Sequence, residues 1–133
     1  MAFTGPAADR QAIREVMDAY SDAVFRHNAE DWIANWAQDG VWRMPGVDVT
    51  GREAIKAAWV QAMSGFKLAG FFSAPGHIAV LGDQAEARSY TQEVLELHAG
   101  GVIRIIGTYD DTLVKQGGQW LFTSRRYRVL RQD

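Results

Sequence analysis

The chain has 133 residues, of which 47% are hydrophobic and 11% aromatic, a composition that excludes a disordered protein and suits one folded domain. Fourteen Lys and Arg against sixteen Asp and Glu give a formal charge of −2, which favours neither nucleic acid nor an anionic membrane as a partner. Absence of Cys excludes disulfides and thiolate chemistry, and the sequence has neither a secretory leader pattern nor an apolar run of membrane-spanning length. We therefore expect a single cytoplasmic domain over residues 1–133, with an ordered core at about 9–130.

A long amphipathic helix is predicted near the start of the chain. Asp9 is a candidate N-cap, and apolar residues recur every three or four positions from Ile13 to Val24. This spacing places them on one stripe, which indicates a helix half buried against another layer. Tyr20 lies on the same stripe, so its hydroxyl needs a hydrogen-bond partner or a ligand.

Two shorter helices are predicted in the next forty or so positions. The first is expected over about residues 29–37 and is followed by a short strand, Val41–Met44, which ends at Pro45-Gly46. Thr50 and Glu53 then have the spacing of a capping box, which predicts a helix that ends near Gly65.

The second half of the chain predicts four long strands. The first is Phe66–Leu81, where Pro75-Gly76 is expected to cause a bend or a bulge. Polar and apolar residues alternate in the other three, and turns containing Gly separate the strands, so we expect sequential antiparallel hairpins. The helices of the first half are the only segments available to cover the apolar face of this sheet. The three further strands are Gln84–His98, Val102–Val114 and Gln119–Leu130.

A set of short motifs accompanies this order of elements. In chain order they are Tyr20, Asp31-Trp32, Asp39-Gly40-Val41-Trp42, Gly51-Arg52-Glu53-Ala54-Ile55, Gly82-Asp83-Gln84-Ala85, Gly107-Thr108-Tyr109-Asp110-Asp111, and Gly118-Gln119-Trp120 with Arg125. The ordered set resembles the SnoaL-like branch of the nuclear transport factor 2-like superfamily. That resemblance implies an α+β cone, in which a curved antiparallel sheet wraps around the long N-terminal helix and two further helices complete the fold. It also implies an apolar pocket at the wide end and a homodimer through the outer face of the sheet.

Relatives in this superfamily differ in what they do, so the fold does not fix the function. They include polyketide cyclases, scytalone dehydratase, ketosteroid isomerase, limonene epoxide hydrolase and non-catalytic binding proteins. The resemblance implies a cofactor-free acid–base enzyme of lyase or isomerase type, acting on a small hydrophobic cyclic or aromatic carbonyl compound. The alternative is a non-catalytic module of the same fold that binds a small ligand or serves in assembly.

The residues that carry catalysis in such relatives are only partly present. Met44 stands where the isomerase has its general base, and Phe25 stands where dehydratase-like relatives have an Asp. Either Phe71 or Phe72 occupies the position of their His. These apolar substitutions favour the binding module. Tyr20 does match a pocket tyrosine of the isomerase, and either Asp110 or Asp111 matches its pocket carboxylic acid.

Proton transfer in an apolar cavity requires a base that titrates near neutral pH, and His77 is the best candidate by residue type. Its alternative is a surface or structural histidine. Asp111 shares a strand face with Tyr109, so it becomes a buried acid or base if that face is concave. The alternative for Asp111 is an ion pair with Arg125 or Arg126 on the next strand.

The remaining site candidates are assigned to substrate binding. Tyr20 completes the catalytic set with His77 and Asp111, and Tyr109 would help it to orient a substrate oxygen. Glu93 becomes a second interior carboxylate if its strand face is concave. Trp42, Trp59 and Phe72 are expected in the pocket wall.

The sequence predicts no metal site and no cofactor. Its three His lie far apart, and the Gly pairs fall in hairpin turns, where they do not open helices. The basic cluster at residues 125–131 is expected to divide between the two faces of its strand.

Overall fold

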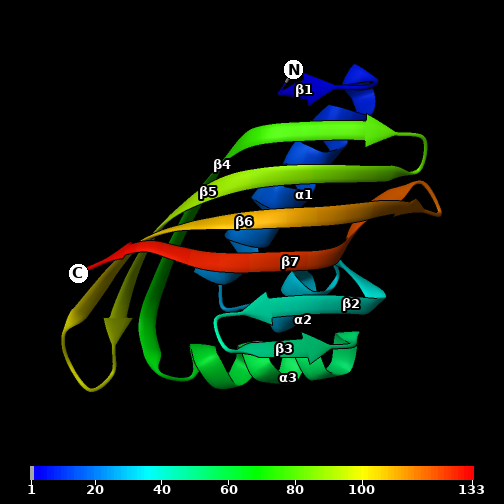
Figure 1. Ribbon diagram of the computed structural model, residues 1–133. Coiled ribbons are helices and arrows are strands. Elements are labelled where there is room, and N and C mark those ends of the chain that lie inside the picture. The colour runs from blue at the N-terminus through cyan, green and yellow to red at the C-terminus, as the bar shows by residue number, and fades with distance from the viewer. Residues whose placement is uncertain (1) are drawn as a thin grey trace.

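The computed structural model describes residues 2–133, which form helices and a single sheet (Figure 1). The helices are α1 (Ala7–Phe25), α2 (Ala29–Ile33) and α3 (Arg52–Met63). The strands are β1 (Phe3–Thr4), β2 (Trp36–Met44), β3 (Val47–Thr50), β4 (Phe66–Leu81), β5 (Gln84–Leu97), β6 (Val102–Gln116) and β7 (Gln119–Gln132).

The sheet has the strand order β1-β4-β5-β6-β7-β2-β3. Strands β4 to β7 are sequential antiparallel neighbours, which confirms the predicted hairpins. The short strands make the sheet mixed, because β1 runs parallel to β4 and β2 runs parallel to β7. Neither β1 nor β3 was predicted, since two- and four-residue strands show too few alternations to be recognised.

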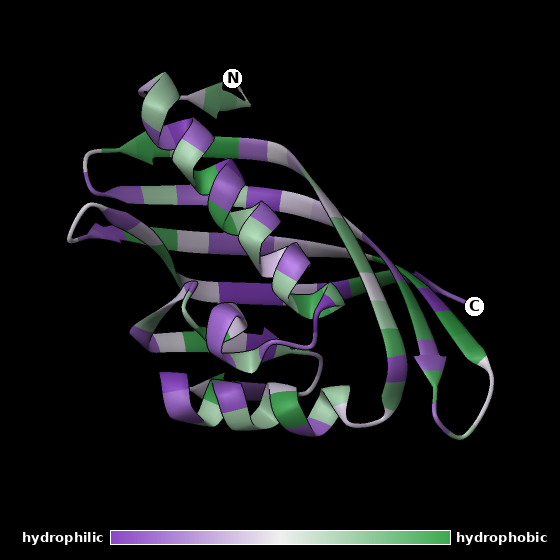
Figure 2. Ribbon diagram, turned by 180° about the vertical axis from the view of Figure 1, so that it is seen from behind, coloured by the Kyte–Doolittle hydropathy of each residue, from purple (hydrophilic) through white to green (hydrophobic). Residues whose placement is uncertain are grey.

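Helix α1 crosses one face of the curved sheet, and α2 and α3 lie below its C-terminal end (Figures 1 and 2). The predicted apolar stripe faces the sheet, with Ile13, Met17, Tyr20 and Val24 buried. The sheet therefore has an inner face, which contacts α1, and an outer face without a helix. This is the predicted α+β cone. No helix in residues 2–133 has the length and apolar character needed to cross a membrane.

Both predicted helix caps are wrong. Helix α1 begins two residues before Asp9, at Ala7, with Pro6 in the N-cap position and no side-chain cap. Thr50 belongs to β3, and the N-cap of α3 is Gly51, whose φ of 93° is accessible to glycine without strain. The Gly51 amide donates to the carbonyl of Gly40 at 2.8 Å, so the β-hairpin determines this helix start.

The predicted second helix and first strand also have different bounds. Helix α2 ends at Ile33, and β2 already begins at Trp36, five residues before the predicted Val41. Trp36 is fully buried and in register with Phe122 of β7. Burial of a large aromatic side chain is a tertiary effect, and it overrides the local helical pattern.

The bulge predicted in β4 is confirmed, and it determines the position of His77. Pro75 is in register with Ser89, whereas His77 is in register with Arg88, so Gly76 is the extra residue. Ser89 is fully buried on the inner face, and Arg88 points the other way. The bulge therefore places His77 on the outer face.

Candidate active site

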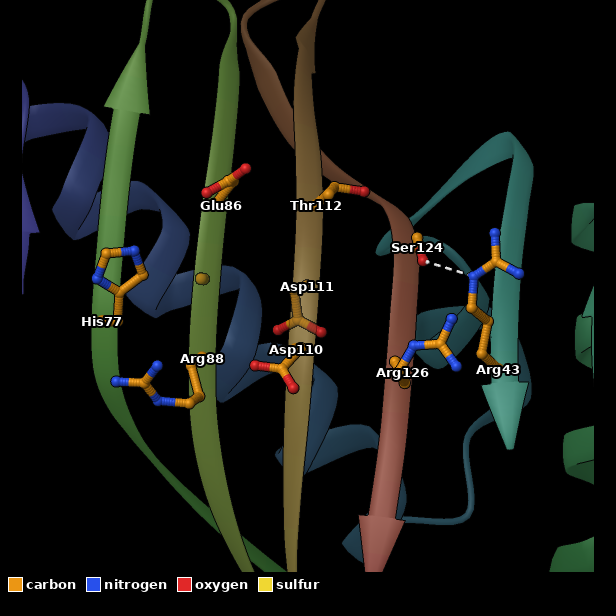
Figure 3. A pocket seen from close by; sticks show the side chains of 10 residues that line it. Arg43, His77, Glu86, Arg88, Asp110, Asp111, Thr112, Ser124 and Arg126 are labelled. Carbon is orange, nitrogen blue, oxygen red and sulfur yellow. Dashed lines mark hydrogen bonds between the residues drawn. The ribbon is translucent and has the colours of Figure 1, made fainter. Parts of the chain in front are cut away.

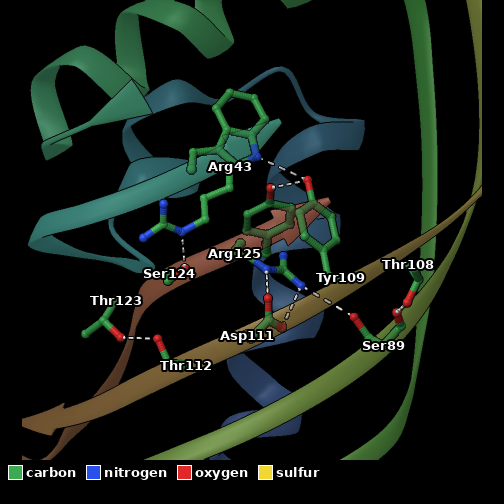
Figure 4. Close-up of polar contacts among 11 residues, drawn as sticks. Arg43, Ser89, Thr108, Tyr109, Asp111, Thr112, Thr123, Ser124 and Arg125 are labelled. Atoms are coloured by element: carbon green, nitrogen blue, oxygen red, sulfur yellow. Dashed lines mark hydrogen bonds and ion pairs between the residues drawn. The ribbon is translucent and has the colours of Figure 1, made fainter. Parts of the chain in front are cut away.

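The inner face of the sheet carries a polar cluster beneath α1. The hydroxyl groups of Tyr20 on α1 and Tyr109 on β6 lie 3.4 Å apart, and the Trp42 indole N–H donates to the Tyr109 oxygen at 3.3 Å (Figure 4). Burial raises the pKa of both tyrosines, so each remains a neutral phenol able to donate a hydrogen bond. These three residues, predicted as site residues, are thus brought together.

A buried ion pair lies beside the tyrosines. The Arg125 guanidinium donates to the Asp111 carboxylate through two bonds, from Nε to Oδ1 at 2.8 Å and from Nη2 to Oδ2 at 3.1 Å (Figure 4). Burial raises the pKa of Asp111, and the attached guanidinium opposes that shift. The predicted interior position of Asp111 is confirmed, and of its two alternatives the structure contains the ion pair.

Arg125 also fills space in the core. Its guanidinium carbon lies 3.8 Å from the ring centre of Tyr109, 4.1 Å from that of Phe122 and 4.5 Å from that of Tyr20. Such contacts stabilise a desolvated cation. With the rings of Trp32 and Phe71 5.2 and 5.7 Å from the Tyr20 ring, side chains occupy the interior around Tyr20.

A second carboxylate lies on the inner face, and no cation pairs with it among residues 2–133. Glu93 on β5 is partly buried; its Oε2 accepts from the Tyr127 hydroxyl at 2.5 Å and from the Thr91 hydroxyl at 3.0 Å. Burial raises the pKa of Glu93, and the two hydrogen bonds partly oppose this shift. Burial and the nearby Glu93 also raise the pKa of Tyr127. The inner-face position of Glu93 agrees with the predicted alternation.

The neighbours of Glu93 across the sheet are apolar. Phe71 on β4 and Ile105 on β6 are in register with it on either side. Phe71 is buried and Ile105 is partly buried against the core. A carboxyl group between two apolar side chains has a higher pKa than one in water, so its ionised form is a stronger base than that of an exposed glutamate.

Gly107 on β6 provides the space that this arrangement needs. A Cβ at this position would lie 2.7 Å from Thr91 Oγ1 and 2.8 Å from the Tyr127 hydroxyl. Only a residue without a side chain therefore lets Tyr127 reach across β6 to Glu93.

His77 lies apart from this interior cluster. It lines a groove on the outer face with Arg88, Asp110 and Arg126, whereas α1 lies behind the sheet (Figure 3). Asp110 also faces outward and pairs with Arg128 at 3.3 Å. The structure thus does not bring His77 together with Tyr20 and Asp111, and it identifies Asp111 as the inward member of the Asp110-Asp111 pair.

Phe25 contacts Phe72, one of the two phenylalanines expected at the position of the histidine in dehydratase-like relatives. The ring centres of Phe25 and Phe72 lie 5.2 Å apart in an edge-to-face arrangement, and both side chains are exposed, by 38% and 62%. Phe72 therefore lies at the surface. Trp59, which like Trp42 and Phe72 was predicted in the pocket wall, is buried and stacks on Trp32 with 4.8 Å between ring centres.

Tyr127, which hydrogen-bonds Glu93, was not predicted as a site residue from the sequence. Period-two alternation places it on the same face as Arg125, a signal that was available. Its reach to Glu93 depends on the one intervening strand, β6, and on Gly107 in that strand, which no single-strand pattern contains. Residues 2–133 hold no group of three His, Asp or Glu side chains arranged to bind a metal ion.

The fold and the interior polar cluster place the chain among the small α+β cones of the nuclear transport factor 2-like type. The chain belongs to the SnoaL-like domain family, whose sequence model matches residues 6–126. No curated protein sequence matches it.

Solved structures share this fold. A candidate scytalone dehydratase from Novosphingobium aromaticivorans DSM 12444 is similar with a TM-score of 0.89 at 24% identity, over 95% of this chain and 87% of the other. The type 3 hexachlorocyclohexane dehydrochlorinase LinA from Novosphingobium barchaimii LL02 is similar with a TM-score of 0.84 at 17% identity, over 95% and 89%. A protein of unknown function from Mycobacterium tuberculosis, Rv3472, has a TM-score of 0.84 at 26% identity, over 96% and 77%.

Proposed function

We propose that the chain is a cofactor-free acid–base enzyme of lyase or isomerase type, and that Glu93 transfers the proton. The observation that carries this proposal is the hydrogen-bonded, partly buried Glu93 carboxylate, which has a raised pKa and no cation paired with it among residues 2–133. Membership of the SnoaL-like family and the likeness to a dehydrochlorinase and a candidate dehydratase support this class of reaction.

Glu93 suits this role better than the two residues ranked first from the sequence. Asp111 is held by two bonds to Arg125, and a proton on its carboxylate would have to displace one of them. His77 lies on the other face of the sheet from the tyrosines. Tyr20 and Tyr109 would polarise a substrate oxygen only if the side chains that occupy the interior around Tyr20 moved aside to admit it.

The reaction step follows from these positions. The Glu93 carboxylate removes a proton from a carbon beside a carbonyl group, and the electron pair of the broken C–H bond moves onto the carbonyl oxygen. When the carbonyl group re-forms, the enolate either takes the proton back from Glu93 at another carbon, which isomerises the substrate, or expels a group from the adjacent carbon with its bonding electron pair, which is an elimination. Phe71 and Ile105 beside Glu93 favour a small hydrophobic, cyclic or aromatic substrate.

Proton abstraction can be tested before the natural substrate is known. In deuterated water, the protein should exchange the protons next to the carbonyl group in some members of a panel of cyclic and aryl ketones, followed by NMR. We expect Glu93→Gln to lose this exchange and Glu96→Gln, a half-buried neighbour on β5 that pairs with Lys67, to keep it. Exchange that persists in Glu93→Gln would rule out the assignment of Glu93.

A non-catalytic binding protein is the second candidate function. The apolar side chains of Phe25 and of Phe71 and Phe72 favour it, because the resemblance implies an Asp at the first position and a His at one of the other two in dehydratase-like relatives. A protein that binds panel ketones without exchanging any of their protons would support this alternative.

We also propose that the chain forms a homodimer through the outer face of the sheet, as the resemblance implies. Tyr90 on β5 and Ile106 on β6 are exposed there by 44% and 40%. Light scattering should give twice the mass of one chain, and Tyr90→Glu should give a monomer. Leu81→Glu, at the exposed tip of the β4–β5 hairpin, should remain dimeric.

A further inference from the structure

A row of charged side chains crosses the outer face of the sheet. His77 on β4, Arg88 on β5, Asp110 on β6, Arg126 on β7 and Arg43 on β2 are each in register with the next residue of the row. All five line one groove of about 390 Å³ (Figure 3). A groove of this size accommodates a small ligand.

Two neighbours in this row carry the same charge. Arg126 and Arg43 stand directly opposite each other on β7 and β2, an arrangement that destabilises a sheet unless something compensates for it. Asp110 is in register with Arg126 but bonds Arg128 instead, at 3.3 Å. Within residues 2–133, Arg126 has no hydrogen-bond or ion-pair partner for its side chain.

Arg43 is already held in place. Its Nη1 donates to Asp48 Oδ2 at 2.7 Å, and its Nε donates to the Ser124 hydroxyl oxygen at 3.3 Å. Because that hydroxyl accepts from Arg43, its own proton is available to a further acceptor. One positioned guanidinium, one unpaired guanidinium and one hydroxyl donor thus meet at the β7–β2 side of the groove.

We propose that this side of the groove binds a small oxyanion, a carboxylate or a phosphoryl group, between Arg126 and Arg43, with Ser124 as a third donor. Guanidinium groups match the paired oxygens of such anions, and a bound negative charge offsets the repulsion between the two arginines. The carboxylates of Asp110 and Glu86 line the other side of the groove. They restrict the site to a compact anion near β7 and β2. This site is independent of Glu93.

Titration with inorganic phosphate and with acetate tests the proposal, using the Arg side-chain NMR signals at low, constant ionic strength. We expect saturable shifts, and we expect Arg126→Gln and Arg43→Gln each to weaken binding by about tenfold or more, as the loss of a charge-assisted hydrogen bond would. Arg104→Gln, on the outer face of β6 but outside the groove, removes the same charge and should leave binding unchanged.

The two anions distinguish the source of the ligand. Binding of phosphate alone supports a phosphoryl ligand, and binding of acetate alone supports a carboxylate. The absence of a saturable shift with both anions would overturn the proposal. An equal loss of binding in Arg104→Gln would also overturn it, because it would show that the anion responds only to the net charge of the protein. Tyr90 and Ile106, where we propose the dimer contact, do not line the groove, so a dimer is expected to keep the site open, and the mass in solution is measured alongside. A dimer that binds neither anion also overturns it.

Discussion

At the scale of single residues, the Asp111–Arg125 pair combines two fully desolvated charges that satisfy each other. Their side chains are 0% and 2% exposed. A buried pair of this kind adds little net stability compared with apolar residues of the same volume, but breaking it leaves a buried charge without a partner. The pair should therefore be much more sensitive to a single substitution than to a double one.

We expect Asp111→Asn to lower the free energy of unfolding by about 3–5 kcal/mol, because Arg125 then lacks its counter-charge. Urea denaturation followed by Trp fluorescence measures this change. The double variant Asp111→Leu/Arg125→Met should recover most of the loss. A single-variant loss below about 1 kcal/mol would mean that Arg125 reaches solvent.

The hydrogen bonds of Asp9 make the free energy of unfolding depend on pH. Its carboxylate accepts hydrogen bonds from the Trp120 indole and the Lys115 ammonium, both at 3.1 Å, and these lower the pKa of Asp9 below 3.8. The unfolded chain therefore binds this proton at higher pH than the folded chain. The contribution of Asp9 to stability is complete above the unfolded pKa of about 3.9 and is lost as the pH falls through the folded value.

We expect Asp9→Asn to be less stable than the wild type at pH 7 and to lose less stability on acidification to pH 3. Urea midpoints at the two pH values measure both differences. Asp18→Asn, an exposed position on the same helix, provides the control and should change neither. Equal acid sensitivity of wild type and Asp9→Asn would contradict the assignment.

At the scale of elements, Gly107 shows how one strand supports the geometry of its neighbours. Its Cα lies beneath the Tyr127 side chain, so we expect Gly107→Ala to displace that ring and to cost about 1–3 kcal/mol of stability through overpacking. The same variant should lose the proposed proton exchange. Gly65→Ala, whose new Cβ would meet nothing closer than 3.8 Å, tests for a general effect of adding a methyl group and should retain both properties.

The local sequence pattern predicts which face of a regular strand a side chain occupies, but it does not predict bulges or hairpin contacts. Alternation along β6 correctly predicts that Tyr109 and Asp111 share the inner face, because a strand without a bulge keeps a period of two. In β4 the extra residue Gly76 reverses the alternation, and the side that His77 faces depends on it. Thr50 failed as a cap because its backbone pairs with Val41 in a hairpin, a contact that no capping motif encodes.

At the scale of the whole molecule, the family resemblance correctly predicted the cone-shaped fold. The hydrogen bonds inside the cone could not be predicted, because they join residues far apart in the sequence. The Tyr127–Glu93 bond joins residues of β7 and β5 across β6, and the Tyr20–Tyr109 contact joins α1 to the sheet. Such contacts are set by register and curvature together. The sequence could therefore place Glu93 on the inner face without revealing its hydrogen-bond partner.

Glu93 also predicts how the stability of the molecule changes with pH. Because its pKa is raised in the folded protein, deprotonation opposes folding, and stability should fall as the pH rises from 4.5 through the folded value. We expect Glu93→Gln to lack this fall and to have a higher melting temperature than the wild type at pH 7, a common result of removing a functional group. Calorimetry between pH 4 and 8 measures both effects. A Glu93→Gln variant that melts below the wild type at pH 7 would contradict the claim that the ionised Glu93 destabilises the folded protein.

The most direct test of the account is the pKa of Glu93, measured from its side-chain carboxyl ¹³C signal in an NMR titration. We predict a value above 4.5 in the wild type and a higher value still in Tyr127→Phe, because the Tyr127 hydroxyl stabilises the ionised form. A Glu93 that titrates at or below 4.5, or that does not respond to the loss of the Tyr127 hydroxyl, would contradict the claim that this carboxylate is poised for proton transfer.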